Sequence, residues 1–161
     1  MNVFISHKQE DELHAREVFS VLTRNGVEAY LDVLDPHMGA QTSGALTAHI
    51  IEMLSKCTHI IPVVTDKTER SWWVPFEIGI ATEKGRSIAS YVPRVMALPE
   101  FLHEWPYLSS TKELDDYVLV ARSQRDKFSR TNYETKGVSE KRTTSRSFER
   151  ELKSRLDFAR R

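Results

Sequence analysis

This chain contains a single cysteine, Cys57, among its 161 residues. A lone cysteine excludes a disulfide within the chain and a zinc site built on cysteine pairs, and it fits a reducing compartment. Because Cys57 directly precedes an apolar run, we interpret it as a small buried hydrophobic side chain. None of the six histidines shows metal-ligand spacing with a third partner, so we expect no metal site.

Long hydrophobic runs are also missing. Residues 1–6 contain no basic segment followed by an extended apolar stretch, so we expect no signal peptide. No apolar run approaches the ~20 residues that a helix needs to cross a bilayer. We therefore expect a cytoplasmic protein without a membrane anchor.

Net charge of either sign is absent too. The chain carries 23 Lys/Arg and 23 Asp/Glu, so no overall field indicates nucleic acid as a partner. The charges are unevenly spread, with 13 Lys/Arg against 6 Asp/Glu in residues 122–161 and 10 against 17 in residues 1–121. A basic tail on an acidic body can bind an acidic partner or can be a solvated extension. The sequence leaves both interpretations open.

Short apolar runs alternate with helical patterns along the chain, without internal repeats. Strands followed by helices favour a parallel sheet covered on both faces. Pro62 lies within the clearest strand, where we expect a bulge or a locally unpaired position because proline lacks an N–H. The predicted strands cover 3–5, 27–31, 60–64 and 88–92, and the predicted helices lie within 13–22, 43–54, 71–84 and 112–128.

The remaining segments are less regular. Residues 98–108 form an aromatic-rich connection, and residues 131–147 are nearly devoid of apolar side chains, which indicates a flexible loop or disorder. The last segment regains a helical stripe at Phe148, Leu152 and Leu156, with Ser147 as its N-cap.

In parallel sheets of this type, ligands bind at the carboxyl ends of the strands. Ser6, His7 and Lys8 follow the first predicted strand, and Asp32 follows the second. Further along, Trp73 lies four residues before Glu77, which places both on one helical face. From spacing alone, however, Glu77 is a surface glutamate on an amphipathic helix.

Several segments in order resemble the TIR domain family. These are residues 3–7, the Tyr30-Leu31-Asp32 run with Gly39 after it, residues 60–65, and the W-x-x-x-E pattern from Trp73 to Glu77. The resemblance covers roughly residues 1–120. It implies a flavodoxin-like three-layer sandwich with a central parallel sheet, with residues 1–121 as the domain. The resemblance does not extend to residues 122–161, and we expect them to form a basic helical extension with a flexible loop near 131–147.

The resemblance also implies an activity. Many TIR domains cleave NAD at the nicotinamide–ribose bond, and bacterial stand-alone members, as in Thoeris-like antiphage systems, make an ADP-ribose-derived signal for a separate effector. The family's catalytic glutamate falls on Glu77 and its tryptophan on Trp73. NAD would be a substrate, with no further cofactor. Other TIR domains are non-catalytic adaptors that act by TIR–TIR association, and a related nucleoside glycosyl-transfer enzyme is a third reading.

One carboxylate suffices for this chemistry. Ordinary glycosidases need two because the leaving oxygen must be protonated. Nicotinamide instead leaves as a neutral molecule from a cationic ring, and an oxocarbenium-like ribose remains. An ionised carboxylate beside that ribose stabilises its positive charge. We expect Glu77 to be ionised because it lies in the early turns of a helix, where the macrodipole favours anions.

The other candidates would bind the rest of NAD. Ser6 and His7 offer hydrogen bonds to ribose hydroxyls, and Lys8 offers a cation to the pyrophosphate. Asp32 can bind a ribose hydroxyl or cap the following turn. Trp73 can stack on the substrate or pack in the core. Free N–H groups near Gly39 and Ser43, which flank the start of the second helix, can receive a phosphate, although the spacing is neither a Walker A nor a Rossmann fingerprint.

Overall fold

The computed structural model describes residues 1–31, 43–124 and 136–161. The strands are β1 (Asn2–Ser6), β2 (Glu28–Leu31), β3 (His59–Pro62), β4 (Ser87–Ile88), β5 (Ser90–Tyr91) and β6 (Tyr107–Leu108). The helices are α1 (Glu12–Arg24), α2 (Ser43–Lys56), α3 (Trp73–Glu83), α4 (Thr111–Ser123) and α6 (Val138–Ala159). Short 3-10 turns cover Gln9–Asp11, Thr68–Arg70 and Glu100–Glu104.

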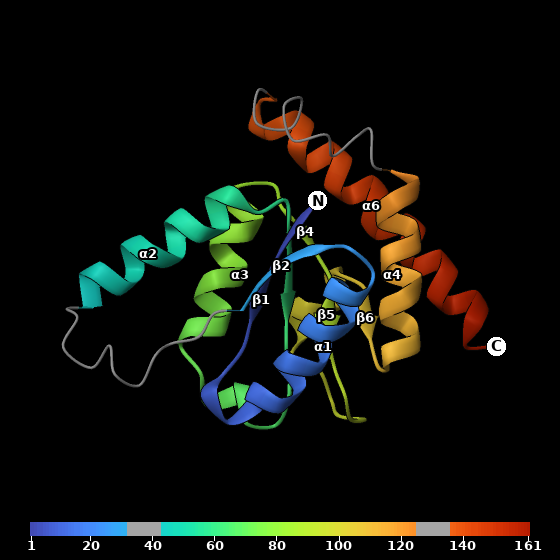
Figure 1. Cartoon of the computed structure of the whole chain (residues 1–161), viewed down its shortest axis with the longest axis horizontal. Helices are drawn as coiled ribbons and strands as arrows, with labels where there is room; N and C mark the ends of the chain where they lie inside the picture. Colours follow the sequence, from blue (N-terminus) through green and yellow to red (C-terminus); the bar gives the residue numbers. More distant parts are fainter. Residues whose placement is uncertain (32–42, 125–135) are drawn as a thin grey trace.

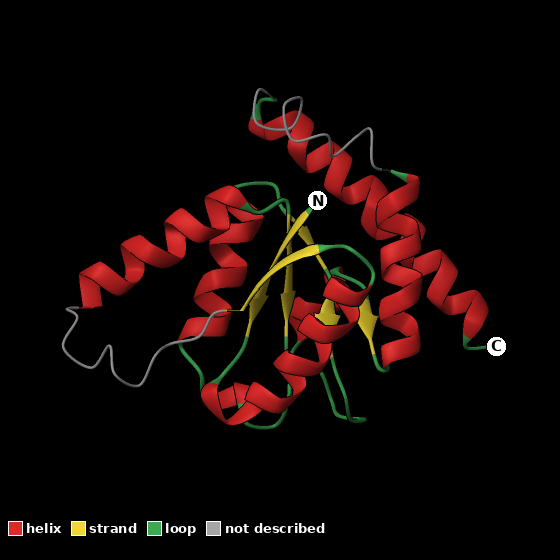
Figure 2. Cartoon of the chain, viewed as in Figure 1, coloured by secondary structure: helices red, strands yellow, loops and turns green. Residues whose placement is uncertain are grey.

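The sheet is parallel, as the alternation of strands and helices predicts. Its strand order is β2-β1-β3-β4, and Val3 of β1 is in register with Ala29 of β2 and His59 of β3. The parallel pair β5-β6 extends it, joined to β3 by a bridge between Val63 and Tyr91. Figure 2 shows these strands between the helices.

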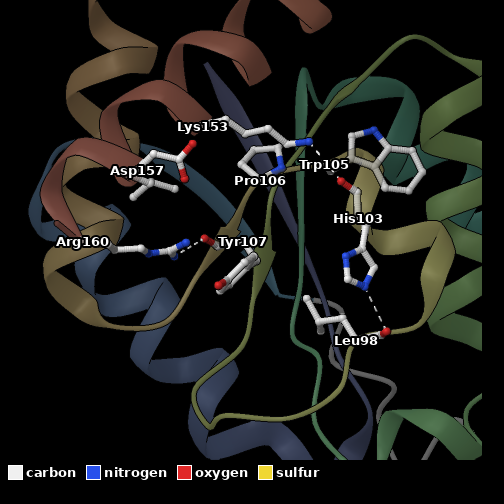
Figure 3. Close-up of a pocket in the computed structure, with 9 residues that line it drawn as sticks. Leu98, His103, Trp105, Pro106, Tyr107, Lys153, Asp157 and Arg160 are labelled. Atoms are coloured by element: carbon white, nitrogen blue, oxygen red, sulfur yellow. Dashed lines mark hydrogen bonds between the residues drawn. The ribbon is translucent and has the colours of Figure 1, made fainter.

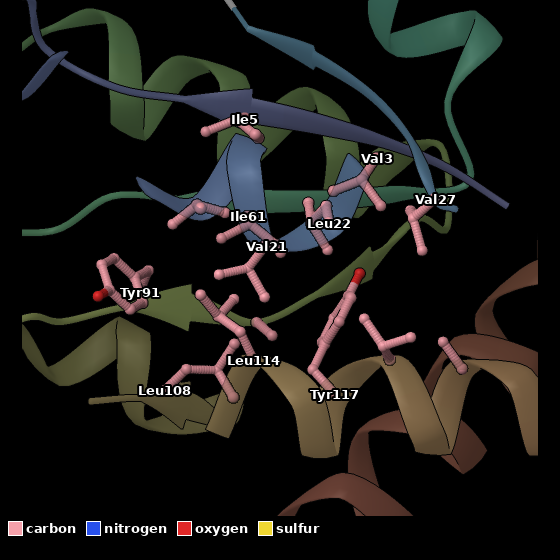
Figure 4. Close-up of a cluster of buried hydrophobic side chains, with 14 of the residues drawn as sticks. Val3, Ile5, Val21, Leu22, Val27, Ile61, Tyr91, Leu108, Leu114 and Tyr117 are labelled. Atoms are coloured by element: carbon pink, nitrogen blue, oxygen red, sulfur yellow. The ribbon is translucent and has the colours of Figure 1, made fainter. Parts of the chain in front are cut away.

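Helices cover both faces of this sheet. The helices α2 and α3 lie on one face, and α1 and α4 lie on the other, with α6 packed against both α4 and the edge strand β4 (Figure 1). Successive side chains of β1 feed the two layers because strand side chains alternate between faces. Val3 and Ile5 join the cluster beneath α1, α4 and α6 (Figure 4), and Phe4 joins the cluster beneath α2 and α3.

Helix α1 shows how far the apolar stripe can be read. Ala15, Val18 and Leu22 are buried as predicted, and Gly26 ends the helix with a φ of 67°. Leu13, which the pattern includes in the same stripe, is 83% exposed, so that prediction is wrong. Leu13 lies two residues from Ala15, which is about 200° around the helix and therefore on the opposite side.

Pro62 in β3 lies opposite the point where the fourth predicted strand, 88–92, divides into two. The strand β3 passes through Pro62 in register with Ser6, and no bulge forms. Val64 N–H donates to the Tyr91 carbonyl at 2.8 Å. Every second residue of a strand faces the same neighbour, so a backbone N–H at position 62 would donate to the carbonyl of Ala89, two residues before Tyr91. Ala89 is where the predicted strand 88–92 separates into β4 and β5. The missing N–H thus produces the unpaired position that the sequence predicts.

The C-terminal helix begins earlier than predicted. Residues 138–147 form its first turns, so the prediction of a flexible loop is wrong there, while residues 131–135 lie outside the described ranges. Ser147 is inside the helix, and Gly137 occupies the N-cap position. The early turns are held by polar contacts: Ser145 Oγ donates to the Gly85 carbonyl at 2.7 Å, and Arg142 pairs with Glu83 at 2.9 Å.

The rest of α6 confirms the predicted stripe. Phe148, Leu152 and Leu156 are at most 1% exposed and belong to the main core cluster. The aromatic-rich connection at 98–108 contains the Glu100–Glu104 turn and β6, so it is more regular than predicted. Among the residues that the structure describes, no helix combines the length and apolar character needed to cross a membrane.

Burial of Glu149 on α6 predicts a pH-dependent stability. Its Oε1 accepts the N–H of Ile88 at 3.0 Å, and burial raises the pKa of the carboxyl from 4.5 to about 7. A raised folded-state pKa means that stability is fully present below pH 4.5 and falls as pH rises through about 7. Glu149→Gln should therefore stabilise the fold by ~1–3 kcal/mol at pH 8 and by little at pH 4.

Urea unfolding of the Glu149→Gln variant at the two pH values measures this difference. Glu140→Gln, an exposed substitution in the first turn of the same helix, is the control and should show no such pH dependence. An equal effect of Glu149→Gln at pH 4 and pH 8 would contradict the raised pKa.

Candidate functional site

Glu77 and Ser6 meet at the carboxyl ends of the strands. Glu77 lies near the start of α3, which follows β3, and Ser6 is the last residue of β1. Both side chains are 0% exposed, and Ser6 Oγ donates a hydrogen bond to Glu77 Oε2. Pairing of β1 with β3 brings these two residues together although 71 positions separate them.

The face that α3 turns toward the sheet explains why Glu77 is buried. Val74, Ile78 and Ala81 on that face pack into the cluster beneath α2 and α3. Glu77 lies three residues after Val74, so it shares this face. Pro75 fits the first turn, where its missing N–H breaks no helical bond. Spacing alone predicted a surface glutamate, and that interpretation is wrong.

His7 and Lys8 take different directions after β1. His7 is 6% exposed and stays within the fold. The Lys8 ammonium pairs with the Glu10 carboxylate at 2.9 Å, and this contact lowers the pKa of Glu10. Ser6, one of the three residues predicted at this strand end, donates a hydrogen bond to the glutamate.

A buried polar network beside this site was not predicted. Asp11 is 3% exposed and accepts a hydrogen bond from Thr65 Oγ1 at 2.8 Å, and the Thr65 N–H donates to Thr68 Oγ1 at 3.0 Å. Lys67 Nζ lies 3.8 Å from Asp11. The network ties the segment after β1 to the segment after β3. The signal in the sequence was an aspartate just before a helix, which indicates an N-cap, but Asp11 bonds across to Thr65 instead.

The two adjacent tryptophans differ in environment. Trp73 is partly buried against the core beneath α2 and α3, and its ring meets Phe76 edge-on at a centroid distance of 5.8 Å. Core packing, one of the two predicted readings of Trp73, is therefore present. Trp72, the residue before it, is 90% exposed.

The other predicted binding residues are only partly described. Asp32 and Gly39 lie outside the described residues. Ser43 is the first residue of α2, at the start of that helix as predicted. Cys57 is fully buried, and burial raises its pKa to about 12, which fits an inert thiol. Within residues 1–31, 43–124 and 136–161, no group of three or more His, Cys, Asp or Glu side chains converges to hold a metal ion.

Comparison with known proteins identifies the family. Residues 3–130 match the family model described as the TIR domain. The chain belongs to the TIR domain family. A solved structure, the crystal structure of the TIR domain of the Toll-related receptor TRR-2 from Hydra magnipapillata, is similar to it with a TM-score of 0.56 and 21% identity. That match covers 77% of this chain and 95% of the Hydra chain and shows the fold alone. No curated protein matches.

Two cavities of this TIR domain lie on α6, away from Glu77. The smaller one, about 130 Å³, lies between α6 and the segment from Leu98 to Tyr107 (Figure 3). Lys153 Nζ donates to the carbonyls of His103 and Glu104 at 3.0 and 2.7 Å, and Arg160 donates to the Tyr107 carbonyl at 2.8 Å. These hydrogen bonds hold α6 against the aromatic-rich connection at residues 98–108. The larger cleft, about 740 Å³, lies between α6 and the end of α3.

Proposed function

We propose that this TIR domain cleaves NAD at the nicotinamide–ribose bond, with Glu77 as the catalytic carboxylate. The observation that supports the proposal is the position of Glu77. It is a carboxylate at the carboxyl ends of parallel strands, oriented by Ser6 from the neighbouring strand. Ligands of open α/β sheets bind at that edge. A preorganised carboxylate there is suited to stabilise positive charge on a ribose.

Three residues of the chain have separate roles in the proposed reaction. Departure of nicotinamide leaves electron deficiency at the ribose carbon, and the Glu77 carboxylate stabilises it without transferring a proton. Ser6 fixes the rotamer of Glu77 through its hydrogen bond. Trp73, one turn earlier on the same helix, is the aromatic candidate to contact the substrate. Water, or a nucleophilic atom within the substrate itself, then attacks the ribose carbon and completes the reaction.

Complete burial of Glu77 adds a requirement. A side chain that is 0% exposed cannot contact a substrate until its surroundings move. In this proposal, association between TIR domains provides that opening, so activity should rise steeply with protein concentration. The ADP-ribose-derived product would serve as a signal in antiphage defence and be read by a separate effector.

Replacing Glu77 by glutamine tests the proposal. Glu77→Gln should lower nicotinamide release from NAD by at least ~100-fold, because a neutral amide cannot balance the positive ribose. Nicotinamide and the second product are separated by chromatography at several protein concentrations. Glu83→Gln is the matched control, since Glu83 lies on the same helix with a side chain 79% exposed, and its activity should equal that of the parent. Equal release by the Glu77→Gln variant would refute the proposal.

The second candidate function is that of a non-catalytic adaptor. Burial of Glu77 with a serine partner favours it, because a structural brace between α3 and β1 has the same geometry. The two functions predict different effects of Glu77→Gln on the free energy of unfolding. A brace loses free energy of unfolding in Glu77→Gln, whereas a buried catalytic carboxylate keeps or gains it. Urea unfolding of the same variant separates them: a destabilised variant, with no nicotinamide released by the parent, favours the adaptor.

A further inference from the structure

The larger of the two cavities on α6 lies at the opposite edge of the sheet from Glu77. It has a volume of about 740 Å³, within the range of small-molecule sites. Its walls come from three parts of the chain: α6, the turn from α3 into β4, and the residues just before β6. Arg86 precedes β4 and Trp105 precedes β6, so the cleft is at the amino ends of strands, whereas Ser6 and Glu77 are at the carboxyl ends.

Basic side chains converge on this cleft. Three of them are exposed and recur every fourth residue, which places them in one row along α6. Arg86 approaches from the far wall with only 8% of its surface exposed, and its Nη2 donates to the Ser55 carbonyl at 3.0 Å. The cations that line the cleft are Arg86, Arg142, Arg146, Arg150 and Lys153.

The carboxylates near these cations are fewer than the cations, and one of them, Glu83, pairs with Arg142 at 2.9 Å from outside the cleft lining. The acidic residues that line the cleft are Glu104 and Glu149. Glu149 turns one oxygen to the Ile88 N–H, and burial raises the pKa of its carboxyl to about 7. A carboxyl that is partly protonated near neutral pH offsets less of the positive charge. The cleft is therefore a basic surface in a chain with balanced total charge.

The cleft also has an aromatic wall. Trp105 is half-buried, lines both this cleft and the smaller cavity, and lies beside Lys153 (Figure 3). A tryptophan ring next to a row of arginines offers a stacking surface and charge-assisted hydrogen bonds together. Ser145 also lines the cleft, but its hydroxyl already bonds to Gly85, so it fixes the wall.

We propose that this cleft binds a nucleotide with at least two phosphates, which places its phosphates on the α6 arginines and its base on Trp105. Arginine forks bind phosphate oxygens in pairs, and a row of them suits a chain of phosphates better than a single one. The site is separate from Glu77, so its occupancy does not depend on NAD cleavage.

Titration with ADP, monitored by NMR, tests this proposal in the whole chain. Binding in the cleft shifts the indole N–H of Trp105, whereas binding near Glu77 shifts that of Trp73. The Arg146→Ala/Arg150→Ala variant should weaken ADP binding at least 10-fold at about 0.15 M ionic strength. Arg155→Ala, on the same helix but paired with Asp116 outside the cleft, should not weaken it.

Two further ligands define the class. Inorganic pyrophosphate and adenosine should each bind at least 10-fold more weakly than ADP, because each lacks half of the contacts. Equal binding of pyrophosphate and ADP, a saturable shift confined to Trp73, or no saturable shift of Trp105 would each overturn the proposal. The Glu77→Gln variant should bind ADP like the parent, so failure of the proposed enzyme and failure of this site are distinguishable.

Discussion

Replacing Phe148 by alanine should lower the free energy of unfolding by about 3–5 kcal/mol. Phe148 is 0% exposed, and its ring meets His59 and Tyr117 edge-on at centroid distances of 5.0 and 5.4 Å. Truncation removes both contacts and leaves a cavity where α6 joins β3 and α4. Because burial lowers the pKa of His59 to about 3, the imidazole is neutral there, and water admitted by the cavity would ease its protonation.

Phe158 on the same helix provides the control for this substitution. Its side chain is 84% exposed, so Phe158→Ala removes the same atoms without opening the core and should cost no more than about 0.5 kcal/mol. Urea unfolding of both variants at neutral pH gives the two values. Similar values for Phe148→Ala and Phe158→Ala would mean that α6 does not complete the core.

The second large effect is expected at Gly85, between α3 and β4. Its φ of 64° lies in the left-handed region, and a Cβ there would approach the backbone nitrogen of Arg142 to 3.0 Å. Gly85→Ala should therefore incur the backbone strain, about 1–2 kcal/mol, and in addition push the first turns of α6 away. We expect a total loss of roughly 3 kcal/mol or more in the free energy of unfolding.

Gly26 separates the two contributions. It has nearly the same backbone angle, 67°, but in the described part of the chain no neighbouring heavy atom lies within 4 Å of a Cβ built on it. Gly26→Ala thus measures the backbone strain alone, about 1–2 kcal/mol. Thermal or urea unfolding of the pair gives the additional cost at Gly85 by difference. If both variants lose the same free energy, the close approach of α6 to Gly85 contributes nothing.

The central sheet could be predicted because its strands carry strong local signals. The runs that became β1 and β3 are apolar on both faces, as buried parallel strands are, and the helices between them have clear apolar stripes. Gly26 and Gly85 mark the ends of α1 and α3 with positive φ values. These features depend on neighbouring residues, so composition and periodicity reveal them.

Features that depend on distant contacts could not be predicted in the same way. The first turns of α6 contain one apolar side chain, the exposed Val138, and are held by Gly85 and Glu83, some 60 positions away. The hydrogen bond that Thr65 donates to Asp11 likewise joins residues 54 positions apart. The position of Glu77 came from the resemblance to the TIR family, because spacing alone placed it on the surface. Its burial depends on how α3 packs, which a short motif does not encode.

The late position of α6 in the chain has a consequence for folding order. Its side chains Phe148, Leu152 and Leu156 complete a cluster whose other members all come from the first 121 residues. During synthesis, the sheet and α4 must hold an uncovered apolar face until α6 emerges. A nascent chain paused between α4 and α6 therefore exposes a hydrophobic surface that chaperones and other chains can bind. The final helix ends that exposure, so its docking is the step at which folding competes with aggregation.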